Sequence, residues 1–364
     1  MAPANFIALA VHMIWLLLSK ACNAVEPKTS RAFPAILIFG DSTVDAGNNN
    51  YILTLFKANY KPYGRDFPGQ IPTGRFSNGK LVPDILASML GIKELVPAFL
   101  DPKLSDDDLR TGVSFGSAGS GYDDLTTTRS GVIPVLKQID LFENYIQRLE
   151  RIVGKEEAKK ILNGALTVVS AGTNDFLFNF YDIPSRSLEY NISGYQAFVQ
   201  NRLQSFIKGL YQLGCRNMVV AGLPPIGCLP IQETLAFQDP KNRKCLENQN
   251  SDSQNYNHKL TKLLHDLQAL LPGSKIHYID IYNPLIDMID HPKKYGFVQT
   301  TKGCCGTGLA ETGPLCNPKT PTCEDPKKYL FWDSVHPTES TYYFVSNSIL
   351  KQLGSYLIQN RSSP

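Results

Sequence analysis

The chain has 364 residues, of which 43% are hydrophobic, and this is enough to bury a large core. Its 36 Lys and Arg residues nearly balance its 33 Asp and Glu residues, for a formal net charge of +3. Such a balance argues against a dedicated nucleic-acid surface. No block of like charges, repeat or low-complexity tract is present, so the composition is that of an ordinary globular protein.

The N-terminal segment has the features of a secretory signal. Residues 6–18 (FIALAVHMIWLLL) form an apolar run that is too short to span a bilayer comfortably. Small residues at Cys22 and Ala24 fit a signal-peptidase site, although no Lys or Arg precedes the run. We therefore expect residues 1–24 to be a cleaved signal peptide and residues 25–364 to be a single domain. An uncleaved anchor or a buried helix are the alternatives, and no later stretch is long and apolar enough to span a membrane.

Five segments of the mature chain have the pattern of strands. The first, Ile36–Phe39, is apolar throughout, as expected for a strand buried on both faces. The other four are residues 111–117, 165–171, 217–222 and 275–281. Helices are expected at residues 51–56, 80–90, 133–153, 155–162, 193–213, 246–271 and 339–357. Because strands alternate with helices and no flexible linker interrupts them, the sequence predicts one α/β/α sandwich with a parallel sheet.

Seven cysteines remain if Cys22 leaves with the signal peptide, so at least one is unpaired in a monomer. Four of them crowd into one Gly-, Pro- and Thr-rich segment: Cys304, Cys305, Cys316 and Cys323. Disulfides there would indicate an oxidising compartment, whereas a zinc site is less favoured because adjacent cysteines without a nearby His are not the usual ligand spacing. Cys228 and Cys245 flank another loop and can pair, and Cys215 is expected to be a buried free thiol.

Two sequons also fit secretion. They predict N-glycosylation at Asn191 and Asn360, each followed two positions later by Ser. We therefore expect an extracellular protein, in the apoplast or cell wall if its source is a plant.

Polar or glycine-rich residues follow three of the predicted strands. They are Gly40–Ser42, Gly119–Gly121 and Gly172–Asp175. The carboxyl ends of parallel strands share one edge of the sheet, so these three segments are expected to converge there. Taken alone, Asp41 and Ser42 can equally be the cap of the next helix.

A candidate general base lies near the C-terminus, in the sequence WDSVHP. Asp333 precedes His336 by three residues, in a segment that Pro337 keeps out of a regular helix. The carboxylate can then hold the imidazole in one tautomer and stabilise the imidazolium when it forms. The other histidines lie in the signal, on predicted helices, in a strand and in a turn, where structural roles are expected: His12, His258, His265, His277 and His291.

Together these segments resemble the conserved blocks of the GDSL-type lipases/esterases of the SGNH hydrolase superfamily. Gly40–Ser42, Gly172–Asp175 and Asp333–His336 resemble the first, third and fifth blocks, and residues 112–121 (GVSFGSAGSG) resemble the second. The likeness to the secreted plant branch extends over nearly the whole mature chain. It includes PTGRFSNGK at residues 72–80, AGLPPIGCLP at 221–230 and FWDSVHPTE at 331–339.

The resemblance implies a flavodoxin-like α/β/α sandwich with a five-stranded parallel sheet. It also implies that Ser42 is the nucleophile, His336 the base and Asp333 its partner. Since Asp333 fills the carboxylate role, Asp41 is expected to shape the turn. Thr43 stands where the family usually has Leu, and we expect it to pack without taking part in the reaction.

The implied oxyanion hole combines three donors: the backbone N–H of Ser42, the side-chain amide of Asn174 and a glycine N–H of the second block. Gly121 is slightly favoured over Gly119 for the third donor. Such a site cleaves carboxylic esters through an acyl-enzyme and requires no metal or cofactor. Three nearby carboxylates lack the spacing of a calcium loop and are expected to cap or shape turns: Asp123, Asp124 and Asp175.

The expected partner is an ester substrate, such as an acyl lipid, an acetylated sugar, a cutin-type ester or a phenolic ester. Two alternatives are an acyltransferase that uses the same acyl-enzyme and a non-catalytic secreted protein that binds carbohydrate or lipid. A glycosidase with paired carboxylates has little support, because Asp333 is already committed to His336. Four aromatic residues after the third block form either an apolar wall of the site or ordinary packing: Phe176, Phe178, Phe180 and Tyr181.

Overall fold

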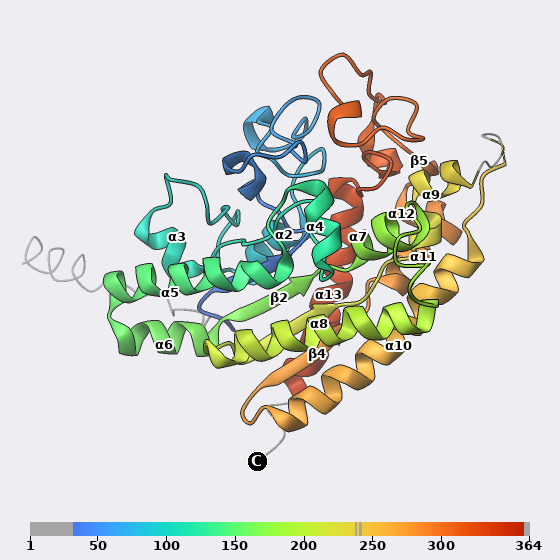
Figure 1. Ribbon diagram of the computed structural model, residues 1–364. Coiled ribbons are helices and arrows are strands. Elements are labelled where there is room, and N and C mark those ends of the chain that lie inside the picture. The colour runs from blue at the N-terminus through green and yellow to red at the C-terminus, as the bar shows by residue number, and fades with distance from the viewer. Residues whose placement is uncertain (1–31, 237–238, 240–241, 360–364) are drawn as a thin grey trace, which may run out of the picture. The chain divides into compact units, whose positions relative to one another are not determined.

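A computed structural model describes residues 32–236, 239 and 242–359 of the chain (Figure 1). The predicted signal peptide, Cys22 and Asn360 lie outside these residues. From Phe33 onward the chain packs as one compact unit. Within the described residues, no helix combines the length and hydropathy that crossing a membrane requires.

The centre of the fold is a parallel sheet with the strand order β1-β2-β3-β4. These strands are β1 (Ile36–Gly40), β2 (Leu166–Ser170), β3 (Asn217–Ala221) and β4 (Lys275–Ile279), which confirms four of the predicted strands. The register places Gly40 opposite Ser170. Polar segments that follow β1 and β2 therefore leave the sheet at the same edge, as the sequence predicted.

The expected fifth strand, at residues 111–117, is a correction to the predicted sheet. This segment runs beside β1 and hydrogen-bonds to both sides of Ile38, yet it forms only an isolated bridge at Ser114. The reason lies at Gly40 of β1. Its backbone N–H donates to the side-chain oxygen of Gln138 at 2.8 Å and is therefore not available to continue the ladder. The α/β class is confirmed, with four strands in the sheet in place of five.

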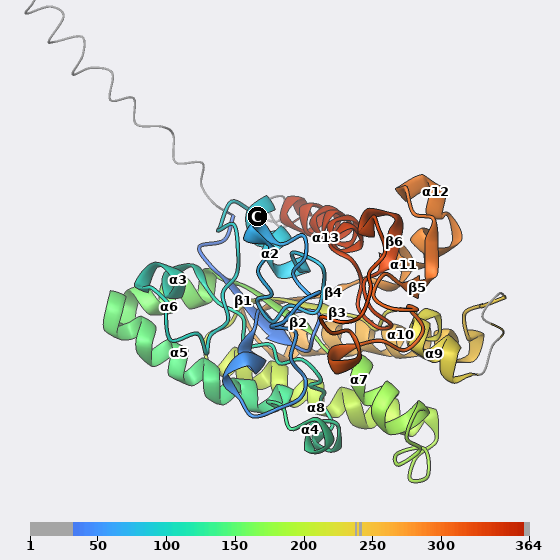
Figure 2. The ribbon, with the colours of Figure 1, turned by 90° about the horizontal axis from the view of Figure 1, so that it is seen from above.

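Two helical layers cover the sheet, so the predicted three-layer α/β/α sandwich is confirmed (Figures 1 and 2). One layer consists of α5 (Gln138–Val153), α6 (Lys155–Gly164), α8 (Ile192–Gln212) and α10 (Glu247–Leu270). The opposite layer consists of α2 (Val82–Met89), α11 (Tyr282–Asp290) and α13 (Glu339–Gln359). The shorter elements are α3 (Asp106–Thr111), α4 (Asp124–Ser130), α7 (Thr173–Phe176), α9 (Pro230–Leu235), α12 (Pro292–Tyr295), β5 (Gln299–Gly303) and β6 (Tyr329–Phe331).

The layer with α5 and α8 packs closely on the sheet. In α5 the apolar residues Phe142, Tyr145 and Leu149 recur at helical spacing and are fully buried. Phe39 of β1 meets Phe142 and Phe206 of α8 edge to face, with ring centroids 5.4 and 5.7 Å apart. These contacts anchor β1, and with it the start of the turn that carries Ser42.

The cysteines pair as disulfides, and this excludes the zinc alternative. Cys304 bonds to Cys323 and Cys305 to Cys316, in the loop that connects the short parallel strands β5 and β6. The expected Cys228–Cys245 disulfide is also present, and Cys215 is a buried free thiol as predicted. By contrast, the helix predicted at residues 51–56 is wrong, because the only helical turn there is a short 3-10 turn at Asn48–Tyr51.

Candidate active site

Ser42 follows β1 in a tight turn that depends on its neighbours. Gly40 has φ +142°, and a Cβ there would lie 1.8 Å from the Ser170 carbonyl oxygen, so only glycine fits. Asp41 Oδ1 accepts hydrogen bonds from the backbone N–H of Thr43 at 3.0 Å and from its hydroxyl at 2.9 Å. Asp41 thus closes the turn through Thr43, in the role that the sequence predicted for it.

Ser42, His336 and Asp333 meet at the carboxyl edge of the sheet. The Ser42 Oγ lies 2.8 Å from His336 Nε2, and His336 Nδ1 lies 2.8 and 2.9 Å from the two carboxylate oxygens of Asp333. All three side chains are buried. The Phe76 ring packs 4.9 Å from the imidazole, centroid to centroid, and helps to fix its plane. Hydroxyl, imidazole and carboxylate follow one another here in the same arrangement as in a Ser-His-Asp triad.

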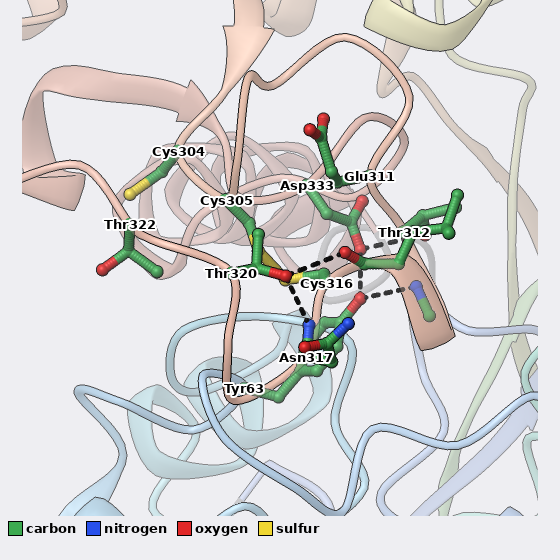
Figure 3. Close-up of a disulfide and its surroundings, with 12 residues drawn as sticks. Tyr63, Cys304, Cys305, Glu311, Thr312, Cys316, Asn317, Thr320, Thr322 and Asp333 are labelled. Atoms are coloured by element: carbon green, nitrogen blue, oxygen red, sulfur yellow. Dashed lines mark hydrogen bonds between the residues drawn. A yellow bond between two sulfur atoms is a disulfide. The ribbon is translucent and has the colours of Figure 1, made fainter.

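Asp333 accepts hydrogen bonds from several groups in addition to the imidazole of His336. Its Oδ1 accepts the backbone N–H groups of Val335 and His336 at 2.8 and 2.7 Å. Its Oδ2 accepts the hydroxyls of Tyr63 at 2.8 Å and Thr312 at 3.1 Å (Figure 3). Burial raises the pKa of the Asp333 carboxyl, but the charge of His336 and these hydrogen bonds outweigh it, and the pKa lies below its ordinary value. The carboxyl is therefore ionised beside the imidazole.

Tyr63 and Thr312 were not predicted from the sequence. Tyr63 lies in a Gly- and Pro-rich loop and is fully buried, and its oxygen accepts the Gly313 N–H at 2.8 Å (Figure 3). Burial and the nearby Asp333 charge raise the pKa of Tyr63 well above its ordinary value, so the phenol remains a donor. Neither residue belongs to a motif, and only the fold brings them to Asp333.

Asn174 stands at the start of α7 and lines the cavity that Ser42 and His336 also line. Its Nδ2 donates one hydrogen bond, to the Ser120 carbonyl at 2.9 Å. A side-chain amide carries two N–H groups, so a second donor remains for a ligand. The structure thus brings Asn174 to the same cavity as the triad.

The two candidate glycines belong to the loop around Ser120. A Cβ on Gly121 would lie 2.1 Å from Asp175 Oδ1, and one on Gly119, at φ +82°, would lie 2.7 Å from the Phe56 ring. Both positions are therefore too close to a neighbour for a larger residue. Neither glycine is on the lining of the cavity at Ser42.

Asp175 fastens this glycine loop to α7. Its carboxylate accepts the backbone N–H groups of Tyr122 and Asp123, at 2.9 and 3.0 Å, and the Thr126 hydroxyl at 2.5 Å. Complete burial raises the pKa of Asp175 to about 7 despite these bonds.

Asp123 caps α4, as expected, and forms an ion pair with Arg186. In the part of the chain that the structure describes, no cluster of His, Cys, Asp and Glu is arranged to hold a metal ion.

Of the aromatic residues after the third block, Phe176 is part of the core, and the other three are partly buried against it. Phe176 is buried against Tyr195 and Tyr256, with ring centroids 5.4 and 5.6 Å apart, and none of the four aromatic residues after the third block lines the cavity. The packing interpretation is therefore the correct one.

Comparison with known proteins agrees with this geometry. Residues 36–349 match the GDSL-like Lipase/Acylhydrolase family. The chain is 53% identical over 360 residues to GDSL esterase/lipase At2g30310 of Arabidopsis thaliana, an alignment that covers 98% of this chain and 99% of that protein. It is 54% identical over 339 residues to GDSL esterase/lipase At2g30220 of the same plant, covering 93% and 94% of the two chains. The protein therefore belongs to the GDSL-like lipase/acylhydrolase family.

Proposed function

We propose that this GDSL-type ester hydrolase cleaves carboxylic esters through an acyl-enzyme on Ser42, with His336 as general base and Asp333 as its carboxylate partner. The observation that carries the proposal is the continuous chain of short contacts from the Ser42 hydroxyl through the imidazole to the Asp333 carboxylate. The names of the relatives, which are esterase/lipases over nearly the full chain, support the same reaction.

The reaction follows from the positions of these groups. His336 Nε2 takes the proton of the Ser42 hydroxyl while Oγ bonds to the ester carbonyl carbon. Asp333 stabilises the imidazolium that forms. The carbon–oxygen bond to the alcohol then breaks, and His336 returns the proton to the leaving alcohol. Water hydrolyses the acyl-enzyme by the same steps, which frees the acid and restores Ser42.

Negative charge develops on the ester carbonyl oxygen when Ser42 attacks, and hydrogen-bond donors must stabilise it. We assign the Ser42 backbone N–H and the unused N–H of Asn174 to this role, together with a backbone N–H of the glycine loop, for which Gly121 is preferred to Gly119. The hydrogen bond from Asn174 to Ser120 supports this grouping, because it ties the amide to that loop. The Asp175 carboxylate holds the adjacent backbone.

Secretion is a further part of the proposal: residues 1–24 are a signal peptide, and residues 25–364 are one extracellular hydrolase domain. Three disulfides support an oxidising compartment. Asn191 is exposed at the start of α8, where a glycan on its amide would extend into solvent, and Asn360 is the second proposed glycan site. N-terminal sequencing of the secreted protein should begin after Ala24, and an N-terminus at Met1 would contradict cleavage.

A fluorophosphonate probe tests the proposed nucleophile. The native protein should be labelled and lose esterase activity, whereas Ser42→Ala should be neither labelled nor active, because the probe bonds to an activated serine oxygen. A native protein that resists the probe would contradict the proposal and favour the non-catalytic lipid- or carbohydrate-binding alternative.

Product analysis with an added acceptor alcohol separates hydrolysis from acyl transfer. The catalytic residues cannot separate them, because both reactions start from the same acyl-enzyme.

A further inference from the structure

A cavity of about 110 Å³ extends from the catalytic serine into the protein, between the sheet and the layer of α2, α11 and α13. Its inner lining is apolar and comes from the strands β2, β3, β4 and β6 and from the helices α2, α11 and α13. The principal side chains are Leu86, Val168, Val219, Leu285, Val345 and Ile349. A hydrolase needs only the mouth of such a cavity for the reaction itself, so its depth requires another explanation.

The strand register gives the direction of the cavity. Ser170 lies at the carboxyl end of β2, opposite Gly40, and Val168 is two residues closer to the start of the strand. A strand advances about 3.3 Å per residue, so Val168 lies roughly 7 Å deeper than Ser170 along the sheet. Val219 of β3 is paired with Val168 and also lines the cavity. The cavity therefore runs along the strands, away from the edge where Ser42 lies.

Two buried side chains beside the cavity keep some exposed surface, unlike those at matching depth on the opposite face of the sheet. Side chains that point from the sheet toward α5 and α8 have no exposed surface, as at Phe39, Val169 and Met218. Toward α13, Val168 retains 7% exposure, and Ile349 on the facing helix retains 6%. Because protein interiors are close-packed, residual exposure this far below the surface marks space that an occupant can fill.

Polarity changes along the cavity. The polar side chains of its lining gather at the mouth, at the ends of β1 and β2 and in the catalytic loops: Asp41, Ser42, Thr43, Ser170, Thr173, Asn174 and His336. The hydroxyls of Thr43 and Ser170 are 3.1 Å apart and satisfy each other. The remaining polar side chain of the lining is Tyr342, whose buried hydroxyl has no hydrogen-bond partner among the described residues. Burial and the charges of Asp333 and Asp41 raise the pKa of this phenol, so it lies near the catalytic end of the cavity. The inner part therefore offers neither charge nor hydrogen bonds to an occupant.

We propose that this cavity binds the acyl chain of the substrate, and that the protein is selective for esters of medium-length, unbranched aliphatic acids over acetyl esters. The proposal rests on the acyl-enzyme at Ser42, because the chain must begin at the carbon that bonds to the Ser42 oxygen. An apolar chain starting there has one enclosed apolar path, along β2 and β3 and under α13. Tyr342, Val345 and Ile349 follow each other at helical spacing and form one wall of this path.

The first measurement is the chain-length dependence of kcat/KM for p-nitrophenyl esters from acetate to dodecanoate. Each methylene that leaves water favours the bound state by about fourfold. The octanoate should therefore exceed the acetate by about a hundredfold or more, with a decline once the chain outgrows the cavity. A profile that is flat, or highest at acetate, would overturn the acyl cavity.

Substitutions in α13 test where the chain lies. Ile349→Phe fills the inner part and should lower the octanoate-to-acetate ratio of kcat/KM by about tenfold, whereas Ile349→Ala should move the optimum to a longer chain. Leu353→Ala is the matched control, because Leu353 is a core residue one turn further along α13 that does not line the cavity. It should keep the wild-type chain-length profile. If the Leu353 and Ile349 variants changed the profile alike, the assignment of Ile349 to an acyl cavity would be wrong.

A measurement on the wild-type protein avoids any dependence on folding of the variants. Fluorophosphonates that carry a methyl or an octyl group on phosphorus should label Ser42 at different rates, the octyl reagent faster. Labelling and acetate hydrolysis without any gain from longer chains would refute the acyl cavity alone. Absence of both labelling and ester hydrolysis would refute the proposed function, and the acyl cavity with it.

Discussion

Asn174 joins the cavity at Ser42 to the glycine loop. One of its amide hydrogens binds the Ser120 carbonyl, and the side chain also lines the cavity, so its second N–H is available to a ligand there. A donor fixed before the reaction stabilises the oxyanion without reorganisation, and it acts on the transition state more than on the bound ester. Its effect should therefore appear in kcat.

We expect Asn174→Ala to lower kcat by roughly two to three orders of magnitude, which corresponds to the loss of about 3–4 kcal/mol of oxyanion stabilisation. KM should change little, because the ground-state ester makes little use of this donor. Steady-state kinetics on a p-nitrophenyl ester would measure both constants, with the melting temperature as a control for folding. A variant as active as the wild type would remove Asn174 from the oxyanion hole.

At the scale of elements, the cysteine-rich loop between β5 and β6 helps to position the carboxylate of Asp333. The Cys305–Cys316 disulfide encloses Thr312 and Gly313, which contact Asp333 directly and through Tyr63 (Figure 3). Hydrogen bonds to a charged group contribute about 1.5–3 kcal/mol each. Loss of the disulfide should therefore affect both the stability of the loop and the position of the Asp333 carboxylate.

We expect the double variant Cys305→Ala/Cys316→Ala to lose about 3 kcal/mol of stability and to lower kcat by about tenfold. Melting temperature and kcat should be measured together. The matched control is Cys228→Ala/Cys245→Ala, which removes a disulfide whose loop makes no hydrogen bond to Asp333 among the residues described. The control should lose stability but keep more of its kcat. Equal losses of kcat in the two double variants would contradict a specific link to Asp333.

At the scale of the whole molecule, several buried carboxyls ionise with difficulty. Burial raises the pKa of Asp41 and Asp45 to about 6, and the pKa of Asp175 and Glu233 to about 7. Between about pH 4 and pH 7 the folded protein therefore holds protons that the unfolded chain has released. The free energy of unfolding must then fall as the pH rises through this window.

We expect a higher melting temperature at about pH 5 than at about pH 7.5, since these carboxyls are protonated in the folded state at the lower pH. His277 acts in the opposite direction, because burial lowers its pKa and destabilises the folded state in acid. Four carboxyls outweigh one imidazole in this window. Thermal unfolding across the pH range would check the balance, and a molecule more stable at the higher pH would show that the carboxyls do not dominate.

Local sequence patterns were sufficient for the sheet core and for the contact between Asp333 and His336. The apolar run at residues 36–39 and the Asp333–His336 spacing are short-range signals, and both the strand and the contact follow from them. The segment at residues 111–117 was wrongly predicted to be a full strand of the sheet. Its ladder with β1 stops where the Gln138 side chain accepts the Gly40 N–H, a contact that no local pattern reveals. Tyr63 reaches Asp333 across 270 positions of the chain, and such a contact exists only after folding.

The position of α13 has a consequence for how this family diversifies. Val345 and Ile349 lie outside all four sequence blocks that carry the reaction, yet they form the wall along which we place the acyl chain. Paralogues can therefore share every catalytic residue and still differ in the ester that each prefers. Comparison of the four sequence blocks groups such paralogues by reaction. Comparison of the residues on the inward face of α13 would group them by the acyl chain that each prefers.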